Sequence, residues 1–454
     1  MRTVLEEQQV PSATVPASPM TRTQDSVSDF GNRLNTTLYE NPSPSKQGTA
    51  QPQLTRWVFL IGAATFATTM SQTGILRLPF QNLLKSELHV SRETMASFFA
   101  VTALAWYFKP LAGILTDSVP LFGTRRRHYL IWSALCAAAF YFLASVVSSK
   151  YVLLVIVLIA ANAMLVVGST VAGGLTVEAG QRYGATGRLS SAMYVVANGC
   201  VLLGGPLGGF LAARAFGFTA ATCALISLSV VPFGWWFVCE PTSERKSNET
   251  WAKAKAQFSW LIHSRTMWTA AGLLFLVYIA PGFSTPLYYL QTDTLNLSQQ
   301  FIGTLILLGG LFGIGGSFLY AVLCPKVSLR ALLYLSIAAS ALGSLGYLFY
   351  RSAMAATVVE SENGLIAAFV TLALMDLAAR ATPSGSEALG FALMMSVLNA
   401  AQSLSDIFGS WLMDQRHVSF LKLVWLNAGT TAFVLVLIPL LPSALITHRD
   451  TTRS

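Results

Sequence analysis

Ionisable side chains within long apolar stretches are the residues of this sequence best placed to do chemistry. Arg77, Lys109, Asp376 and Asp406 each lie in such a stretch. A charged side chain inside a bilayer costs roughly 2.5–3.5 kcal/mol on insertion scales, so such residues are typical of solute or proton pathways. Each of them could bind a solute or carry a proton along a water-filled path. The alternatives are that they snorkel to the membrane surface or form structural ion pairs.

A short basic loop between two apolar stretches is the second feature. Residues 109–130 read K-P-L-A-G-I-L-T-D-S-V-P-L-F-G-T-R-R-R-H-Y-L. Pro110 cannot donate a backbone hydrogen bond, which leaves the carbonyl of Trp106 without its helical partner. Two apolar helices joined by so short a basic loop are typical of a hairpin that crosses a membrane twice. The charged residues of the loop are Asp117, Arg125, Arg126 and Arg127.

The composition predicts a membrane protein. Of the 454 residues, 54% are hydrophobic and 11% are charged, whereas soluble proteins have about 25% charged residues. The formal net charge of +9 does not indicate nucleic-acid binding, because the Lys and Arg residues gather in loops on one side of the predicted membrane helices. The five cysteines form no C-x-x-C pair, so neither a disulfide framework nor a zinc site is expected.

Neither an enzyme nor a cofactor-binding protein is expected. The five histidines fall in loops or at the ends of apolar stretches, and none belongs to an H-E-x-x-H motif. No Walker-type glycine loop is present, so direct drive by ATP has no support in the sequence.

Twelve apolar stretches predict an all-α membrane protein with twelve transmembrane helices. Each stretch holds about 18 to 26 residues, and a spanning helix needs about 20. An even number of spans places both termini on one side, and the excess of Lys and Arg in the loops of that side predicts that it is the cytoplasm. The predicted helices are 57–78, 94–115, 129–148, 151–173, 190–211, 217–239, 267–290, 301–323, 330–350, 363–380, 386–411 and 421–445.

The longest break between apolar stretches divides the predicted helices into two halves of six, an organisation typical of transporters with repeated halves. The first residues are rich in Ser, Thr, Pro, Gln and Asn, which is typical of disorder. The predicted parts are a disordered cytoplasmic tail at 1–55, a first half at 56–239, a cytoplasmic linker at 240–266, a second half at 267–446 and a cytoplasmic tail at 447–454.

Two glycine-rich segments predict close contacts between helices, because small residues four apart let helix backbones touch in a membrane. The first is G-G-P-L-G-G at Gly204–Gly209, and the second extends from Gly309 to Gly316.

Two long motifs resemble those of the folate–biopterin transporter family of the major facilitator superfamily. The first is K-P-L-x-G-x-x-x-D-S-x-P-L-F-G-x-R-R-R-x-Y-L, from Lys109 onward, and the second is S-G-S-E-A-L-G-F-A-L-M-M-S-V-L-N, which ends at Asn399. The resemblance covers both halves and implies a major facilitator-like fold. It also implies that Arg77 and Lys109 occupy basic positions of the family, where a guanidinium can hold a carboxylate or a heterocycle with two hydrogen bonds.

One segment departs from the family pattern. The family reads D-x-x-x-D-x-L-x-V-E in its fourth helix, whereas this chain has Ser169 and Gly173 at the two Asp positions and retains Glu178. If those carboxylates recognise a pterin or couple protons, the substrate of this chain differs from that of the family.

The resemblance also leads to a hypothesis about gating. Ser384–Glu387 reads S-G-S-E, a capping box at the start of the predicted eleventh helix. Helices two and eleven are neighbours in the superfamily, so Asp117 would lie against that positive helix end when the inner gate is closed. Arg125, Arg126 and Arg127 would hold Asp117 in place, or would serve only as a cytoplasmic topology signal.

The function that the sequence favours is secondary active transport of a small, polar, anionic solute of the folate or pterin type, with proton coupling as an option. The alternatives are a transport-inactive scaffold or receptor, a major facilitator transporter with an unrelated substrate, and a membrane-embedded enzyme. We expect the plasma or inner membrane, with a plastid membrane as the alternative, and we expect a monomer whose partners are a small-molecule solute and the lipid bilayer. The candidate solute or coupling residues are Arg77, Lys109, Glu178, Asp376, Asn399 and Asp406.

Overall fold

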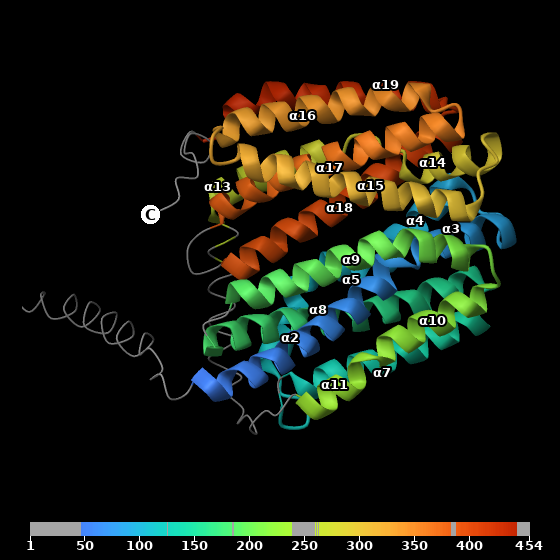
Figure 1. The fold of residues 1–454 in the computed structure, drawn as a ribbon. Coiled ribbons are helices and arrows are strands. Elements are labelled where there is room, and N and C mark those ends of the chain that lie inside the picture. Colours follow the sequence, from blue (N-terminus) through green and yellow to red (C-terminus); the bar gives the residue numbers. More distant parts are fainter. Residues whose placement is uncertain are drawn as a thin grey trace, which may run out of the picture. The chain divides into compact units, whose positions relative to one another are not determined.

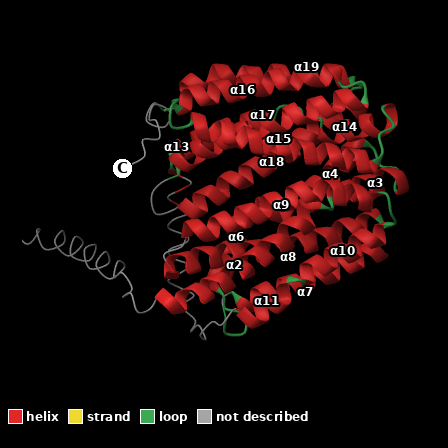
Figure 2. Cartoon of the chain, in the orientation of Figure 1, coloured by secondary structure: helices red, strands yellow, loops and turns green. Residues whose placement is uncertain are grey.

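The apolar stretches fold as helices, because backbone polar groups in lipid must form hydrogen bonds within their own segment. In the computed structural model, the described residues form helices and loops, and the only strand-like pairing among them is a bridge between Leu121 and Thr124 (Figure 2). The structure describes residues 47–124, 126–183, 186–237, 259, 261, 263–382 and 387–442.

Ten helices within these residues are long and apolar enough to cross a membrane. The prediction of an all-helical membrane protein is therefore confirmed. The ten are Thr55–Glu87, Arg127–Val146, Tyr151–Ala179, Val195–Ala212, Phe216–Phe237, Gln299–Leu323, Leu329–Phe349, Ala353–Ala381, Leu389–Asp414 and Phe420–Leu440.

Several of the predicted helices are interrupted, and in two of them the breaks leave no uninterrupted apolar span. The predicted helix 94–115 is divided into α4 (Arg92–Thr102), α5 (Leu104–Tyr107) and α6 (Lys109–Ser118). Its second break precedes Pro110, which stands in the first turn of α6 and has no N–H to continue the preceding helix. The predicted helix 267–290 is divided into α13 (Arg265–Tyr278), α14 (Ser284–Tyr289) and the π-helix η4 (Leu290–Thr294), with Pro281 and Gly282 in the break.

Three helices extend well beyond their predicted ends. α8 (Tyr151–Tyr183) ends ten residues after the predicted 173. The first helix begins at Gln47, inside the predicted tail, and continues to Glu87 through α2 (Gln47–Thr69), η2 (Met70–Gly74), α3 (Arg77–Asn82) and η3 (Leu83–Glu87). α17 (Ala353–Ala381) begins ten residues before the predicted 363. Its N-cap is Ser352, whose side chain accepts a hydrogen bond from the backbone of Ala355. The cap explains why the helix starts at Ala353, although the glutamates Glu360 and Glu362 lie within its first turns.

The described helices form two groups in Figure 1, with most of those before residue 237 in the lower part and most of those after residue 265 in the upper part. The described residues from Leu54 onward form one compact unit. The remaining helices are α7 (Arg127–Val146), α8 (Tyr151–Tyr183), α9 (Thr186–Ala212), α10 (Phe216–Leu228), α11 (Val230–Phe237), α15 (Gln299–Leu323), α16 (Leu329–Gly346), α18 (Glu387–Asp414) and α19 (Phe420–Val434), with the 3-10 turns η5 (Tyr347–Phe349) and η6 (Leu435–Leu440).

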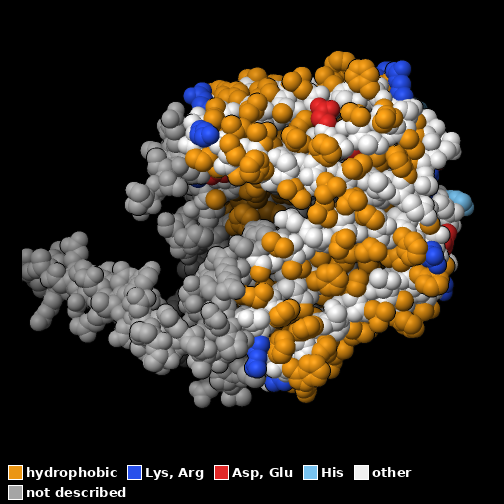
Figure 3. Space-filling model, in the orientation of Figure 1, with side chains coloured by type: hydrophobic (Ala, Val, Ile, Leu, Met, Phe, Trp, Pro, Cys, Tyr) orange, Lys and Arg blue, Asp and Glu red, His pale blue; other side chains and the backbone are white. Residues whose placement is uncertain are grey.

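The surface is apolar over the flanks of the bundle. Hydrophobic side chains cover much of the visible face, and Lys and Arg are found mainly near the two ends (Figure 3). Phe318, Phe349 and Leu440 are each more than 70% exposed, as side chains that face lipid are. The buried core consists of clusters that lie mainly within residues 60–237 or within residues 261–441.

One backbone pattern occurs twice. η3 ends at Glu87, His89 follows with a positive φ of 49°, and Ser91 then caps α4. η4 ends at Thr294, Asn296 follows with a positive φ of 50°, and Ser298 then caps α15. The two segments are 207 residues apart, the separation of the hydrogen-bonded pairs Arg77–Ser284 and Lys85–Thr292.

Candidate functional site

A cavity of about 570 Å³ lies inside the bundle. This volume suits a small organic solute, since ligand cavities commonly enclose about 300–1,000 Å³. Its walls come from η2, α3, α4 and α5 before residue 110, and from α13, α14, α16, η5, α17, α18 and α19 after residue 265. Figure 3 shows a hollow in the surface between α15 and α9.

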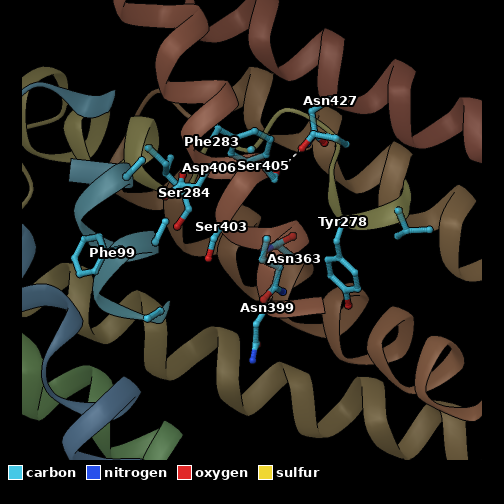
Figure 4. A pocket seen from close by; sticks show the side chains of 18 of the residues that line it. Phe99, Tyr278, Phe283, Ser284, Asn363, Asn399, Ser403, Ser405, Asp406 and Asn427 are labelled. Carbon is cyan, nitrogen blue, oxygen red and sulfur yellow. Dashed lines mark hydrogen bonds between the residues drawn. The ribbon is translucent and has the colours of Figure 1, made fainter. Parts of the chain in front are cut away.

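The lining combines aromatic rings with amide and hydroxyl groups (Figure 4). Such a wall can stack on a flat ring and hydrogen-bond to the ring's polar edges. The aromatic members are Phe99, Trp106, Tyr107, Tyr278, Phe283 and Tyr347, and the amides are Gln72, Asn363, Asn399, Gln402 and Asn427.

Arg77 brings positive charge to the cavity. Its guanidinium donates a 2.7 Å hydrogen bond to the hydroxyl of Ser284 and lies 5.3 Å from the ring centre of Phe99. The ion pairs between described residues do not include Arg77. Because a guanidinium has five N–H donors, Arg77 keeps donors for an anionic group.

Asp406 also lines the cavity, but its carboxylate is already hydrogen-bonded. One oxygen accepts a 2.8 Å bond from the backbone N–H of Thr285, and the other accepts a 2.6 Å bond from the hydroxyl of the same residue. Ser405 contacts the preceding break through the backbone N–H of Gly282, which donates to its carbonyl at 2.9 Å. Asp406 therefore stabilises the start of α14.

Lys109, Glu178 and Asp376 are not among the residues that line the cavity. Lys109 donates a 3.0 Å hydrogen bond to the hydroxyl of Ser169 and lies 5.3 Å from the ring centre of Trp106, a lining residue. Asp376 pairs with Arg380 at 2.8 Å, and the hydroxyl of Tyr320 donates to it at 2.9 Å. These two groups thus already have hydrogen-bonding partners.

The predicted gating residues are described only in part. Arg126 lies 4.0 Å from the carboxylate of Glu178, whose side chain is 62% exposed. Arg127 donates a 3.1 Å hydrogen bond to the carbonyl of Trp235 and lies 5.0 Å from its ring centre. Arg125, Ser384 and the side chains of Asp117 and Glu387 lie outside the described residues. Of the predicted site residues, the structure brings together Arg77, Asn399 and Asp406.

The sequence analysis missed Glu360 and Asn363, which line the cavity from α17. Glu360 lies before the predicted start of that helix at 363, and Asn363 is its first predicted residue. The signal that could have revealed them is Ser352, an N-cap residue followed by an apolar run.

Polar contacts close the bundle at the end where α3 and α14 lie, hereafter the α3–α14 end (Figure 1). Lys85 pairs with Asp293, and Arg92 pairs with Asp414 at 3.0 Å. Between the two pairs lies the ring of Tyr289, 5.0 Å from the Lys85 ammonium and 4.9 Å from the Arg92 guanidinium. These contacts join helices on both sides of the cavity.

Comparison with known proteins identifies a matching family and similar proteins. The model of the BT1 family matches residues 71–453. A folate-biopterin transporter of Synechocystis sp. is 26% identical over 380 residues, which are 79% of this chain and 74% of the relative. A probable folate-biopterin transporter 2 of Arabidopsis thaliana is 34% identical over 77 residues, which are 16% of this chain and 15% of that protein.

Solved structures of transporters share the fold. The nucleoside transporter NupG matches with a TM-score of 0.66 at 11% identity, over 85% of this chain and 98% of its own. A D-xylose-proton symporter matches with a TM-score of 0.62 at 16% identity, over 86% of this chain and 98% of its own. At such identities the likeness concerns the fold.

Proposed function

This chain belongs to the BT1 family, and from that premise we propose that it is a secondary active transporter for a small, polar, anionic organic solute of the folate or pterin type. The solute occupies the cavity that Arg77 lines, and transport proceeds by alternating access with proton coupling. The names of the curated relatives support this class of solute.

The observation that carries the proposal is a cation with free donors in a cavity of suitable size. Arg77 has no ion-pair partner among the described residues, and Phe99 and Trp106 line the same cavity. An arginine fork binds a carboxylate through two parallel hydrogen bonds, and flat aromatic rings suit a planar heterocycle. Lys109, which contacts Trp106, adds a second positive charge near the wall.

The proposed architecture is twelve transmembrane helices in two halves of six. Counting the segments 92–118 and 265–294 as one span each adds two to the ten helices that are long and apolar enough to cross a membrane. The repeated backbone pattern supports two related halves. Arg77 and Ser284 are equivalent residues of the repeat and touch each other, as residues near a two-fold axis do.

Alternating access then follows from how the two ends differ. The contacts of Lys85, Arg92 and Tyr289 hold the α3–α14 end closed, so we assign an inward-open state with this end outside. Both termini are placed in the cytoplasm, on the side of Arg126 and Arg127. A monomer in the plasma or inner membrane completes the proposal.

Uptake of labelled folic acid into proteoliposomes tests the function. Arg77→Gln should reduce the initial rate roughly tenfold or more, because hydrogen bonds to charged groups contribute about 1.5–3 kcal/mol. Arg77→Lys keeps the charge without the planar fork and should be intermediate. Lys109→Gln should also reduce uptake.

Arg214→Gln provides the matched control, since it removes the same charge from an exposed residue that contacts Phe210 and does not line the cavity. Its uptake should equal that of the wild type. Normal uptake by both Arg77→Gln and Lys109→Gln would make these residues structural and the site assignment wrong.

A further inference from the structure

A carboxylate on α17 faces the cavity and lacks a cationic partner within the described ion pairs. Glu360 is a lining residue, and none of those pairs includes it. It accepts a 3.2 Å hydrogen bond from the hydroxyl of Tyr350. Tyr350 is 3% exposed and stacks on Tyr347 with 5.5 Å between the ring centres. The carboxylate is thus held by phenol groups rather than by a positive charge.

Few groups near Glu360 can titrate or carry charge. The segment at the end of α16 contributes the hydroxyls of Tyr347 and Tyr350. η4 contributes the uncharged Gln291, and α15 contributes Gly309, whose built Cβ lies 3.5 Å from the carbonyl of Glu360. The other groups to be considered are Glu362 on α17 itself, the uncharged Asn427 and Thr431 of α19, and Arg77 from α3 in the wall of the same cavity.

An ionised carboxylate removed from water without a counter-charge is costly, and such groups commonly take up a proton instead. We propose that Glu360 carries the coupling proton of the transport cycle. Water in the cavity delivers one proton to the carboxylate, which becomes a neutral acid. The proton returns to water when the cavity faces the other side. This proposal rests on the proposed function, whose proton coupling it assigns to one residue.

A chain of hydrogen bonds connects Glu360 to the closed end of the bundle. The amide of Gln291 donates to the Tyr350 hydroxyl at 2.6 Å, and that hydroxyl donates to Glu360. Gln291 belongs to η4, whose next two residues contact Lys85. Hydrogen bonds to an ionised acceptor are roughly twice as strong as those to a neutral one. Protonation of Glu360 therefore weakens the Tyr350 bond and changes how firmly η4 is held.

Through this connection, protonation of Glu360 affects the conformational equilibrium of the transport cycle. A bound proton can shift a conformational equilibrium only if it interacts differently with the two states. The contacts of η4 with Lys85 exist only while the α3–α14 end is closed. The protonation state of Glu360 thus biases which end of the cavity is open.

The first experiment measures the proton directly on the full chain. Infrared difference spectra between acidic and alkaline buffer are recorded for the wild type, Glu360→Gln and Glu362→Gln in lipid. Glu362 is the matched control, because it lies two residues further on the same helix, is exposed and does not line the cavity. A carboxyl C=O band that disappears on alkalinisation is expected in the wild type and in Glu362→Gln and is missing from Glu360→Gln. The same band in Glu360→Gln would overturn the proposal.

The second experiment separates coupling from binding. Glu360→Gln in proteoliposomes should lose accumulation of labelled folic acid driven by a proton gradient. It should keep the exchange of labelled for unlabelled folic acid, which needs no net proton movement. Gradient-driven accumulation equal to that of the wild type would overturn the proposal. If the wild type takes up no folic acid, the proposed solute is wrong, while the infrared result still decides the role of Glu360.

Tyr350→Phe keeps the test decisive if Glu360→Gln does not fold. The change removes the hydroxyl that donates to the ionised carboxylate and leaves the ring stacked on Tyr347. The neutral acid should then persist to a pH about one unit higher than in the wild type. An unchanged midpoint would assign the infrared band to another carboxyl group and overturn the proposal.

Discussion

Two carboxylates line the same cavity, and their surroundings separate their roles. Asp406 accepts two hydrogen bonds from Thr285, including one from its backbone N–H. Glu360 accepts from tyrosine hydroxyls and has no ion pair among the described residues. A carboxylate at a helix N-terminus is stabilised by the N–H groups and dipole of the helix. We therefore expect Asp406 to act as a structural residue and Glu360 to be the carboxylate that exchanges a proton with water.

Asp406→Ala is expected to lower stability by about 0.5–2 kcal/mol, the usual cost of losing an N-cap side chain. Asp406→Asn keeps one carbonyl oxygen for the N–H of Thr285 and should lose less. The measurement is the melting temperature of the purified protein in detergent. A wild-type melting temperature in Asp406→Ala, together with abolished uptake, would reassign Asp406 from structure to transport.

Residue types in their apolar context identified Arg77 and Asp406 as candidate site residues, the motif that resembles the family added Asn399, and all three line the cavity. The same reasoning could not tell that Asp376 is paired with Arg380, because ionisable residues in apolar stretches look alike until their neighbours are known. It also missed Glu360, since a pair of glutamates resembles the loop before a helix.

At the scale of the helix, hydrophobicity was enough to predict most spans, but the interruptions depend on single residues. Pro110 ends α5 because it has no N–H, and the break before α14 is held by Ser405 and Asp406 of α18. The first of these was visible as a proline in the sequence. The second was not, because its stabilising partner is more than a hundred residues away along the chain.

Glycines on α9 and α15 let these helices touch near the α3–α14 end. A Cβ built on Gly205 would lie 2.5 Å from the carbonyl oxygen of Gly303, and one built on Gly303 would lie 2.3 Å from that of Gly205. Gly205→Ala should therefore force the helices apart and lower stability by about 1–3 kcal/mol. The melting temperature of the purified protein measures this loss.

Gly199→Ala is the control on the same helix, because its built Cβ meets nothing within 4 Å. Alanine is the better helix former, so this change should be neutral or slightly stabilising. Equal melting temperatures for Gly205→Ala and Gly199→Ala would show that the close contact does not contribute to stability.

At the scale of the molecule, the two ends of the bundle are expected to compete. The ion pairs at the α3–α14 end stabilise the state described here, and the predicted contact of Asp117 with the start of helix eleven would stabilise the opposite state. Each contact exists in only one state, so removing either one shifts the equilibrium in a known direction. Loss of the Lys85–Asp293 pair favours opening to the outside, and loss of the Asp117 charge favours opening to the cytoplasm.

The shifts should differ in size as well as in sign. Lys85→Ala is expected to move the ratio of outward-open to inward-open protein upward by about 1.5- to 5-fold, since partly exposed ion pairs contribute about 0.2–1 kcal/mol and the Asp293 side chain is 51% exposed. Asp117→Asn is expected to move it downward by up to roughly thirtyfold, from an upper estimate of about 2 kcal/mol for a partly buried carboxylate at a helix N-terminus. Thiol labelling of single cysteines from each side of the membrane measures the ratio.

The charge swap Lys85→Asp with Asp293→Lys should restore the wild-type ratio, because it rebuilds the pair with its ends exchanged. If Lys85→Ala and the charge swap shift this ratio equally, the Lys85–Asp293 pair does not hold the α3–α14 end closed. If Asp117→Asn folds and leaves the ratio unchanged, Asp117 is only a topology signal.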